Sequence, residues 1–312
     1  MREKILVTGG GGLLGHALRQ ICLQAYFVTS RDFDLTDIQQ TESLFQTIKP
    51  TQVIHLAAKV AGVKSNALRN ADLLAANSQI NTNVLSAAQK SGVERLISVL
   101  SSCSYAVYSD RPSTESDLHV GLPFKGNLGY GYSKRMLDIQ TKLLWEQYGC
   151  EYSTITPVTM YGPNDNWDLE EGHVLGSLIH KCFLAKQNGN PLEVWGSGNA
   201  VRQFVYSLDI AKILLRMLES DYKGPETTVI AADDGIAIKD LVLSIARAMD
   251  FHGEIIFDRT KPEGQLVRVM ESKRFADFFQ DFQFTPLEEG VRRTVDWFRN
   301  QESIVVGSKK GF

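Results

Sequence analysis

The chain has 312 residues, of which 43% are hydrophobic and 22% are charged, and its formal net charge is -3. These proportions predict a globular protein with a sizeable core and exclude a disordered or polycationic chain, so we expect no nucleic-acid partner. No apolar run approaches the roughly 20 residues that span a bilayer, so we expect no membrane partner. The charged N-terminus without a long apolar run, and four cysteines without paired spacing, favour a cytoplasmic protein with free thiols and no metal site.

The first half of the sequence alternates short apolar runs with amphipathic stretches. Strands are predicted at residues 4–8, 26–29, 52–56, 95–99 and 152–158. Helices are predicted at residues 13–24 and 71–91, and a further helix after residue 132. Such alternation is typical of an α/β protein with a Rossmann-like, doubly wound parallel sheet that helices cover on both faces.

The composition changes between residues 162 and 201, where Gly, Pro and Asn cluster. Clusters of this kind mark loops at the mouth of a site or a crossing between domains. Further helices are predicted at residues 207–218, 238–249 and 286–298. We therefore predict a Rossmann domain at residues 1–163 plus about 202–232, and a smaller C-terminal α/β substrate domain at about 164–201 and 233–312.

A glycine-rich loop lies between the first predicted strand and helix. Gly9, Gly12 and Gly15 have the spacing TGxxGxxG. Such glycines allow a tight turn, a close approach of the backbone to a pyrophosphate, and close packing of helix on strand. Followed by Leu13 and Leu14 at the start of the helix, they predict a dinucleotide site.

The end of the second predicted strand indicates which dinucleotide binds. Arg31 stands where an acidic residue would bind the ribose of NAD, and an arginine suits the 2′-phosphate of NADP. Arg31 therefore favours NADP, although it could be a plain surface residue with the adjacent Asp32 as the acidic partner. Further cofactor neighbours are expected at the same crevice: Asp34, Leu35, Leu56, Ala57 and Ala58.

Tyr130 and Lys134 form a YxxxK pattern, which puts them on one face of a helix. A phenol with a pKa of about 10 transfers protons poorly at neutral pH unless a nearby cation stabilises its phenolate. Lys134 supplies such a charge. YxxxK is common by chance, and its significance here comes from the glycine loop and from Ser101, Ser102 and Cys103, which precede it by about thirty residues.

Together, the glycine loop, the serine at a strand end and YxxxK resemble the extended short-chain dehydrogenase/reductase family over nearly the whole chain. Within it, three further segments are similar to the branch that makes GDP-L-fucose from GDP-4-keto-6-deoxymannose. They are Ser101 to Cys103, the run from Tyr161 to Asn166 ahead of His173, and the run from Trp195 to Gly198 ahead of Arg202.

The resemblance implies a homodimeric, NADPH-dependent enzyme that epimerises a GDP-4-keto-6-deoxyhexose at C3 and C5 and then reduces C4. Cys103 would be the base and His173 the acid of epimerisation, while Ser101, Tyr130 and Lys134 would serve the reduction. Implied cofactor contacts are Tyr130, Lys134, Pro157, Met160 and His173. Implied GDP-sugar contacts are Ser102, Asn166, Val174, Leu178, Lys181, Val194, Trp195, Arg202, Glu263 and Arg268.

Several positions depart from the pattern of that branch and leave the substrate open. Lys181 replaces an arginine, Arg268 a lysine and Glu263 a shorter acid, and Ser104 and Ala106 change the wall beside Cys103. One alternative is a C4-reductase, with or without epimerisation, of another GDP-4-ketosugar such as a deoxyheptose or dideoxyhexose. A more remote alternative is an NADP-binding regulatory protein without turnover.

Overall fold

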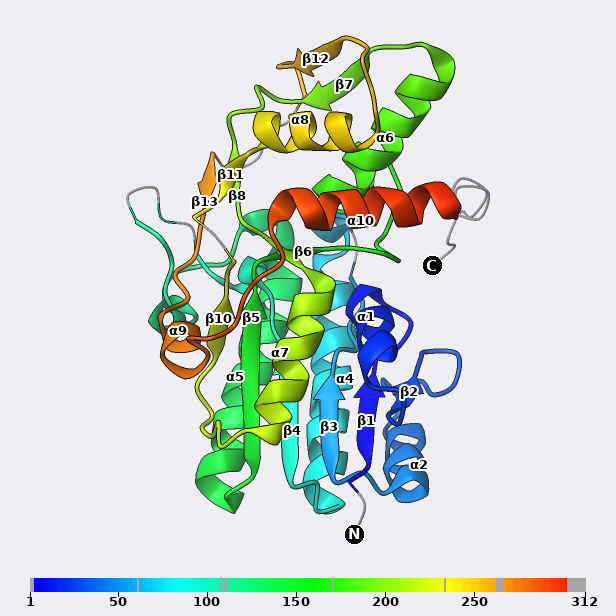
Figure 1. Ribbon diagram of the computed structural model, residues 1–312. Helices are drawn as coiled ribbons and strands as arrows, with labels where there is room; N and C mark the ends of the chain where they lie inside the picture. Colours follow the sequence, from blue (N-terminus) through cyan, green and yellow to red (C-terminus); the bar gives the residue numbers. More distant parts are fainter. Residues whose placement is uncertain are drawn as a thin grey trace.

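A parallel sheet of six strands organises the larger part of the molecule (Figure 1). In this computed structural model, the described residues are 3–60, 62–106, 108, 111–169, 171–232, 234–261 and 266–301. The strand order is β10-β5-β4-β3-β1-β2. The strands are β1 (Ile5–Thr8), β2 (Tyr26–Val28), β3 (Gln52–His55), β4 (Arg95–Val99), β5 (Glu151–Pro157) and β10 (Thr228–Ile230). The order reverses at β1 and β3, and ligands bind at the carboxyl end of such a point.

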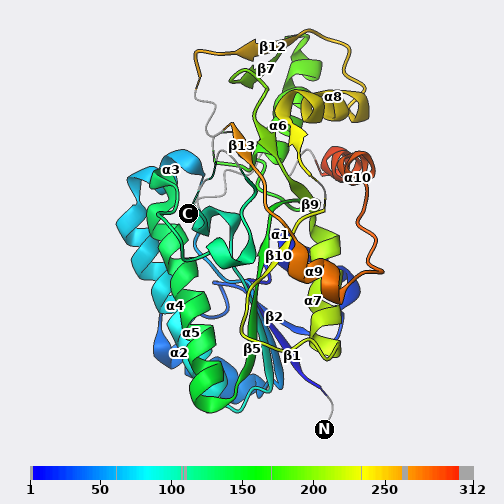
Figure 2. The ribbon, with the colours of Figure 1, turned by 90° about the vertical axis from the view of Figure 1, so that its left-hand side faces the viewer.

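Helices cover both faces of this sheet, as Figure 2 shows. The pair α4 (Asn70–Lys90) and α5 (Leu128–Tyr148) packs on one face, with α2 (Ile38–Ile48) beside α4. The pair α1 (Leu13–Ile21) and α7 (Ser207–Glu219) packs on the other. The strands β1 and β3 to β5 are buried between these layers, and apolar or β-branched residues fill most of their central positions. The predicted doubly wound parallel sheet is confirmed.

A second, smaller core lies over the carboxyl ends of the sheet strands (Figure 1). It contains α6 (Val174–Asn188), α8 (Ile238–Ala248) and α10 (Leu287–Asn300) with the parallel pair β7 (Leu192–Trp195) and β12 (Ile255–Asp258). Leu175, Leu241 and Val295 are fully buried in it. The apolar faces of the three helices meet here, which explains their amphipathic sequences.

Short strands connect the two cores. The parallel pair β6 (Thr159–Tyr161) and β9 (Phe204–Tyr206) and the trio β11 (Ile236–Ala237), β8 (Val201–Arg202) and β13 (Val267–Arg268) lie between them. The helix α9 (Lys273–Phe278) belongs to the range predicted for the smaller domain, yet Phe275 packs in the larger core. The chain therefore passes between the cores several times.

The remaining helical turns lie near the carboxyl end of the sheet. They are α3 (Val63–Leu68) and the 3-10 turns Ser102–Ser104, Glu115–Asp117 and Lys125–Asn127. None of the helices in the described ranges is long and apolar enough to cross a membrane. The same ranges hold no cluster of three or more His, Cys, Asp or Glu side chains that could bind a metal ion.

Candidate active site

The glycine loop makes closer backbone contacts than any side chain would allow. Gly9 has a φ of +72°, and a Cβ on it would lie 2.7 Å from the amide nitrogen of Ala57. A Cβ on Gly15 would lie 2.7 Å from the Cα of Gly10. Gly12 precedes the first residue of α1, and its N–H donates to the Gly9 carbonyl over 3.1 Å. The loop thus exposes backbone at a helix N-terminus, which fits the diphosphate of a dinucleotide.

The turn after β2 separates the roles of Arg31 and Asp32. The Asp32 carboxylate accepts hydrogen bonds from the amide and the hydroxyl of Thr29, both at 2.8 Å. It is therefore committed to its own turn, while Arg31 is exposed. Asp34 likewise accepts from the amide and hydroxyl of Thr36. Of the two candidates, Arg31 is the one whose side chain suits an external ligand, and its charge fits a 2′-phosphate.

Other expected cofactor neighbours lie around the same edge of the sheet. Leu56 and Ala57 follow β3, and their amides donate to the backbone and side-chain oxygens of Thr8 at the end of β1. Pro157 ends β5 and Met160 lies in β6. Further positions are Leu13 and Leu14 in the first turn of α1, Ala58 after Ala57, and the buried Leu35 after β2.

Cys103 lies in a 3-10 turn that follows β4. Ser101 begins the turn, and its hydroxyl oxygen accepts from the Cys103 amide at 3.2 Å. The sulfur accepts from Asn127 Nδ2 at 3.1 Å and from Arg268 Nη1 at 3.7 Å. Burial raises the pKa of the Cys103 thiol, but the Arg268 charge and hydrogen bonds from Ser101, Arg268 and Asn127 outweigh it. The net pKa lies below the usual value, which makes this thiol a suitable proton acceptor.

Tyr130 and Lys134 lie in the buried first turns of α5. Lys134 Nζ donates to the carbonyl of Val99 at the end of β4 over 2.8 Å and is 5.7 Å from the ring centre of Tyr130. Burial lowers the pKa of Lys134 to about 8. Burial and the nearby Cys103 raise the pKa of Tyr130 above its usual value, against a hydrogen bond with Ser101. At neutral pH, Tyr130 is therefore a protonated donor beside a charged lysine.

His173 precedes the first turn of α6, and its imidazole is tied to a buried carboxylate. Nδ1 is 3.0 Å from Asp165 Oδ1, and the side chains are 49% and 2% exposed respectively. The hydrogen bond with Asp165 raises the pKa of His173, burial opposes it, and the charges of Asp165 and Cys103 add to the rise. A histidine with a raised pKa suits proton donation near neutral pH, the opposite role to that of Cys103.

The expected GDP-sugar residues lie mainly on the smaller core. Lys181 on α6 places Nζ 4.4 Å above the ring centre of the half-exposed Trp195. Arg202 on β8 lies opposite Arg268 in the register of the neighbouring parallel strand β13. Leu178 and Val194 are buried in the smaller core, and Val174 is the first residue of α6. Asn166 Nδ2 donates a hydrogen bond to the carbonyl of Glu171, in the loop before His173. Glu263 lies outside the described residues.

Comparisons with known proteins agree with this geometry. The model of the NAD dependent epimerase/dehydratase family matches residues 5–231. The chain belongs to this family. It is 36% identical to GDP-L-fucose synthase of *Dictyostelium discoideum* over 95% of each chain. It is 28% identical to GDP-L-colitose synthase of *Yersinia pseudotuberculosis* over 96% of this chain and 99% of that protein.

A solved structure with a similar degree of sequence identity has the same fold. A GDP-L-fucose synthetase from *Naegleria fowleri* bound to NADP is 35% identical to this chain and superposes with a TM-score of 0.91. The match covers 97% of this chain and 94% of the other. The fold of this epimerase/dehydratase chain, including the smaller core, is thus that of a protein crystallised with a nicotinamide dinucleotide.

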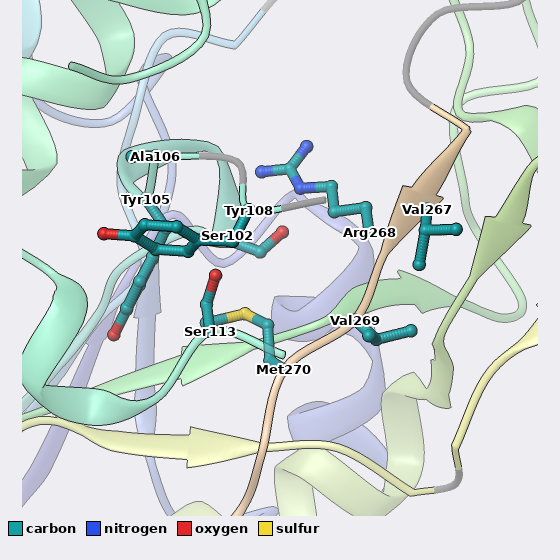
Figure 3. Close-up of a pocket in the computed structure, with 9 residues that line it drawn as sticks. All are labelled: Ser102, Tyr105, Ala106, Tyr108, Ser113, Val267, Arg268, Val269 and Met270. Atoms are coloured by element: carbon teal, nitrogen blue, oxygen red, sulfur yellow. The ribbon is translucent and has the colours of Figure 1, made fainter. Parts of the chain in front are cut away.

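A pocket lies between β13 and the segment that follows β4, as Figure 3 shows. Ser102 and Ala106 line it, and the Arg268 side chain points from β13 toward Ser102 (Figure 3). Ser104, which the sequence places in the same wall, is instead fully buried. The 3-10 turn directs its side chain inward, so Ala106 and Ser102 shape this wall of the epimerase/dehydratase site and Ser104 does not.

Two residues of the site carry no motif and were not identified from the sequence. Asn127 donates to the Cys103 sulfur, although the two are 24 positions apart. Asp165 was noted only as part of a run, and its partnership with His173 depends on how that loop folds back. The only available signal was an asparagine directly before the YxxxK helix and an acid close to a candidate histidine.

Proposed function

We propose that this epimerase/dehydratase catalyses NADPH-dependent 3,5-epimerisation and 4-keto reduction of a GDP-4-keto-6-deoxyhexose, giving GDP-L-fucose. The carrying observation is that one site holds two proton-transfer sets. Cys103 has a lowered pKa and His173 a raised one. Tyr130 forms a hydrogen bond with Ser101 and feels the charge of Cys103, and Lys134 Nζ lies 5.7 Å from the Tyr130 ring centre. A plain reductase would need only the second set.

The chain's own residues fit the cofactor. The backbone of residues 9–15 would hold the diphosphate, Arg31 the 2′-phosphate, and Lys134 the nicotinamide ribose. When bound, NADPH supplies the hydride for C4 of the sugar. Its recognition therefore requires the glycine loop and Arg31 together, and the *Naegleria fowleri* relative binds NADP with the same fold.

Epimerisation needs one group to remove a proton beside the ketone and another to return a proton on the opposite face. The C–H bond becomes acidic because the carbanion delocalises onto the carbonyl oxygen as an enolate. The Cys103 thiolate would take that proton, and the imidazolium of His173 would supply the new one. Hydrogen bonds from Ser101 and Tyr130 to the enolate oxygen would stabilise its charge.

Reduction would use Tyr130, Lys134 and Ser101 at the C4 carbonyl oxygen, which is also the enolate oxygen of epimerisation. As C4 gains a hydride, Tyr130 would donate its phenolic proton to the oxygen, and Ser101 would hydrogen-bond it. The phenolate left on Tyr130 would be stabilised by the Lys134 ammonium, which the Val99 carbonyl holds in place. The two half-reactions therefore share one oxygen and one set of donors.

Substrate, assembly and location follow from the site and from named relatives. The half-exposed Trp195 and the cations Lys181 and Arg202 would bind the nucleotide end by stacking and charge pairing. The relatives are named for GDP-L-fucose. The exposed apolar side chains of Met136 and Leu143 on α5 support a homodimer through α4 and α5. Four free cysteines suit the reducing cytoplasm.

The proposal is tested by incubating the protein with NADPH and GDP-4-keto-6-deoxymannose in D2O. We expect NADPH oxidation and a GDP-L-fucose product that carries deuterium at C3 and C5 by NMR. NADPH oxidation without deuterium at C3 and C5 would show that the protein only reduces C4 and does not epimerise the sugar. Turnover only with a dideoxyhexose or deoxyheptose would favour the second candidate, which the wall of Ser102 and Ala106 and the similarity to a GDP-L-colitose synthase support.

A further inference from the structure

A pair of buried amides adjoins the sulfur of Cys103. Asn127 ends the 3-10 turn before α5 and is 6% exposed, and Asn66 on α3 is 5% exposed. Asn127 Nδ2 donates to the Cys103 sulfur at 3.1 Å. Asn66 Nδ2 donates to Asn127 Oδ1, also at 3.1 Å. The two amides thus form a chain of donors that ends on the sulfur.

The two hydrogen bonds orient the Asn127 amide. Its oxygen accepts from Asn66, and its N–H is directed at the Cys103 sulfur. A donor directed at sulfur stabilises a thiolate and disfavours a thiol, which would need an acceptor there. In this orientation, Asn66 Oδ1 is buried without a hydrogen-bond partner among the described residues, which is unfavourable for folding.

The helix that carries Asn66 is also linked to the other arm of the site. The Asn66 amide donates to the Gly62 carbonyl at the start of α3. The Gly62 amide in turn donates to Glu171 Oε2 at 2.8 Å, two positions before His173. The start of α3 therefore joins the segment of the base to the segment of the acid.

We propose that Asn127 and Asn66 are positioning residues for Cys103: Asn127 holds the sulfur as a thiolate, and Asn66 fixes the orientation of the Asn127 amide. The catalytic consequence rests on the proposed function, in which Cys103 is the base. Ionisable groups that act on the same sulfur are Arg268 on β13, Tyr130 on α5 and His173 before α6. A test must leave these three in place.

The sharpest variant is Asn66→Asp, which keeps the size of the side chain and offers only acceptors. The Asn127 amide would then turn its N–H toward position 66 and its oxygen toward the sulfur, which favours the thiol. We expect the pKa of Cys103 to rise by about one unit, so that its alkylation by iodoacetamide at neutral pH slows roughly tenfold. The pH dependence of alkylation, followed on the Cys103 peptide by mass spectrometry, measures this directly.

Asn70→Asp is the matched control. Asn70 opens α4, and its Oδ1 accepts from the Gly129 amide at 2.8 Å, a role that a carboxylate keeps. A carboxylate loses only the exposed hydrogen bond from Asn70 Nδ2 to the Ala67 carbonyl. The described hydrogen bonds to the sulfur come from Asn127 and Arg268 and not from Asn70, so the Cys103 pKa should stay at the wild-type value. An equal rise in both variants would overturn the inference, since it would reflect an added charge nearby and not the amide orientation.

Two further outcomes keep the test decisive. If Asn66→Asp does not fold, Asn127→Ser removes the donor from the sulfur with a smaller side chain, and it should raise the same pKa. An unchanged Cys103 pKa in either folded variant would contradict the inference. Wild-type protein that exchanges no deuterium would overturn the proposed epimerisation instead, because thiol alkylation needs no sugar substrate.

Discussion

Burial sets the direction of the pKa shifts of Tyr130 and Lys134 on α5, whereas charged and hydrogen-bonded partners set it for Cys103, in the turn after β4, and for His173, before α6. For Cys103, burial alone would raise the pKa, and Arg268 and hydrogen-bond donors reverse it. For His173, burial alone would lower the pKa, and Asp165 reverses it.

This difference determines how each pair responds to mutation. A shift caused by burial persists unless the surrounding core is rebuilt, so the reduction pair is a fixed part of α5. A shift caused by a partner changes with that partner, at little cost in structure. The pKa values of Cys103 and His173, the pair proposed for epimerisation, should therefore respond to single substitutions of their partners, while that of Lys134 should respond little.

The largest expected effect comes from removing the thiol itself. Cys103→Ser replaces a thiolate by a hydroxyl that does not ionise near neutral pH, and we expect deuterium exchange to fall on the order of 10²- to 10⁴-fold. Reduction of an already epimerised ketosugar should persist. Cys150→Ser is the control, because burial raises the pKa of that thiol and it lies at the far end of α5. Equal loss of both half-reactions in Cys103→Ser would contradict the separation of the pairs.

Removing the partner of His173 should produce the next largest effect. Asp165→Asn keeps an acceptor for Nδ1 and removes the charge, so the pKa of His173 should fall toward its usual value. Exchange requires protonated His173 and therefore declines as the pH rises through that pKa. We expect the declining limb to move to lower pH by about one unit, a loss of roughly tenfold on that limb. An unmoved limb would assign the acid elsewhere.

Lys134 should determine where the rate of reduction declines with rising pH, separately from the decline of deuterium exchange. Its pKa is lowered to about 8, so its charge, which stabilises the Tyr130 phenolate, is lost as the pH rises through that value. NADPH oxidation with an already epimerised ketosugar should decline severalfold above this pH in both wild type and Asp165→Asn. A limb that moves with the Asp165 variant would show that the pairs are not independent.

The smallest effect is expected at Ser104, which follows the proposed base Cys103 and does not line the pocket between β13 and the segment that follows β4. Its hydroxyl is fully buried and has no hydrogen-bond partner among the described residues. Ser104→Ala removes a buried unsatisfied group, which should raise the free energy of unfolding by about 1 kcal/mol with unchanged deuterium exchange. Chemical denaturation measures this. A large loss of exchange would instead place Ser104 in the wall of the site.

Local patterns predicted the elements well, because periodicity and caps are encoded in neighbouring residues. The helix expected at 71–91 is α4 (Asn70–Lys90), and that expected at 238–249 is α8 (Ile238–Ala248). The packing of α9 in the larger core was not predicted, since Phe275 meets that core only after the chain crosses back. No local pattern encodes such a crossing.

The catalytic side chains were proposed from motifs and a resemblance, and their roles stay predictions. What the sequence could not supply is the set of groups that adjusts them. Arg268 reaches Cys103 across 165 positions and Asn66 reaches Asn127 across 61, so neither spacing forms a pattern. The tail at residues 303–312, for which no prediction was made, lies outside the described residues.

The most direct test of two separate proton-transfer pairs at one oxygen is deuterium incorporation by Tyr130→Phe. This variant lacks the phenolic proton but keeps Cys103, His173 and their partners. Incubated with GDP-4-keto-6-deoxymannose and NADPH in D2O, it should lose C4 reduction by at least about 100-fold. Deuterium incorporation at C3 and C5 should fall much less, because Ser101 still donates to the enolate oxygen. Loss of both reduction and exchange to the same extent would contradict the account.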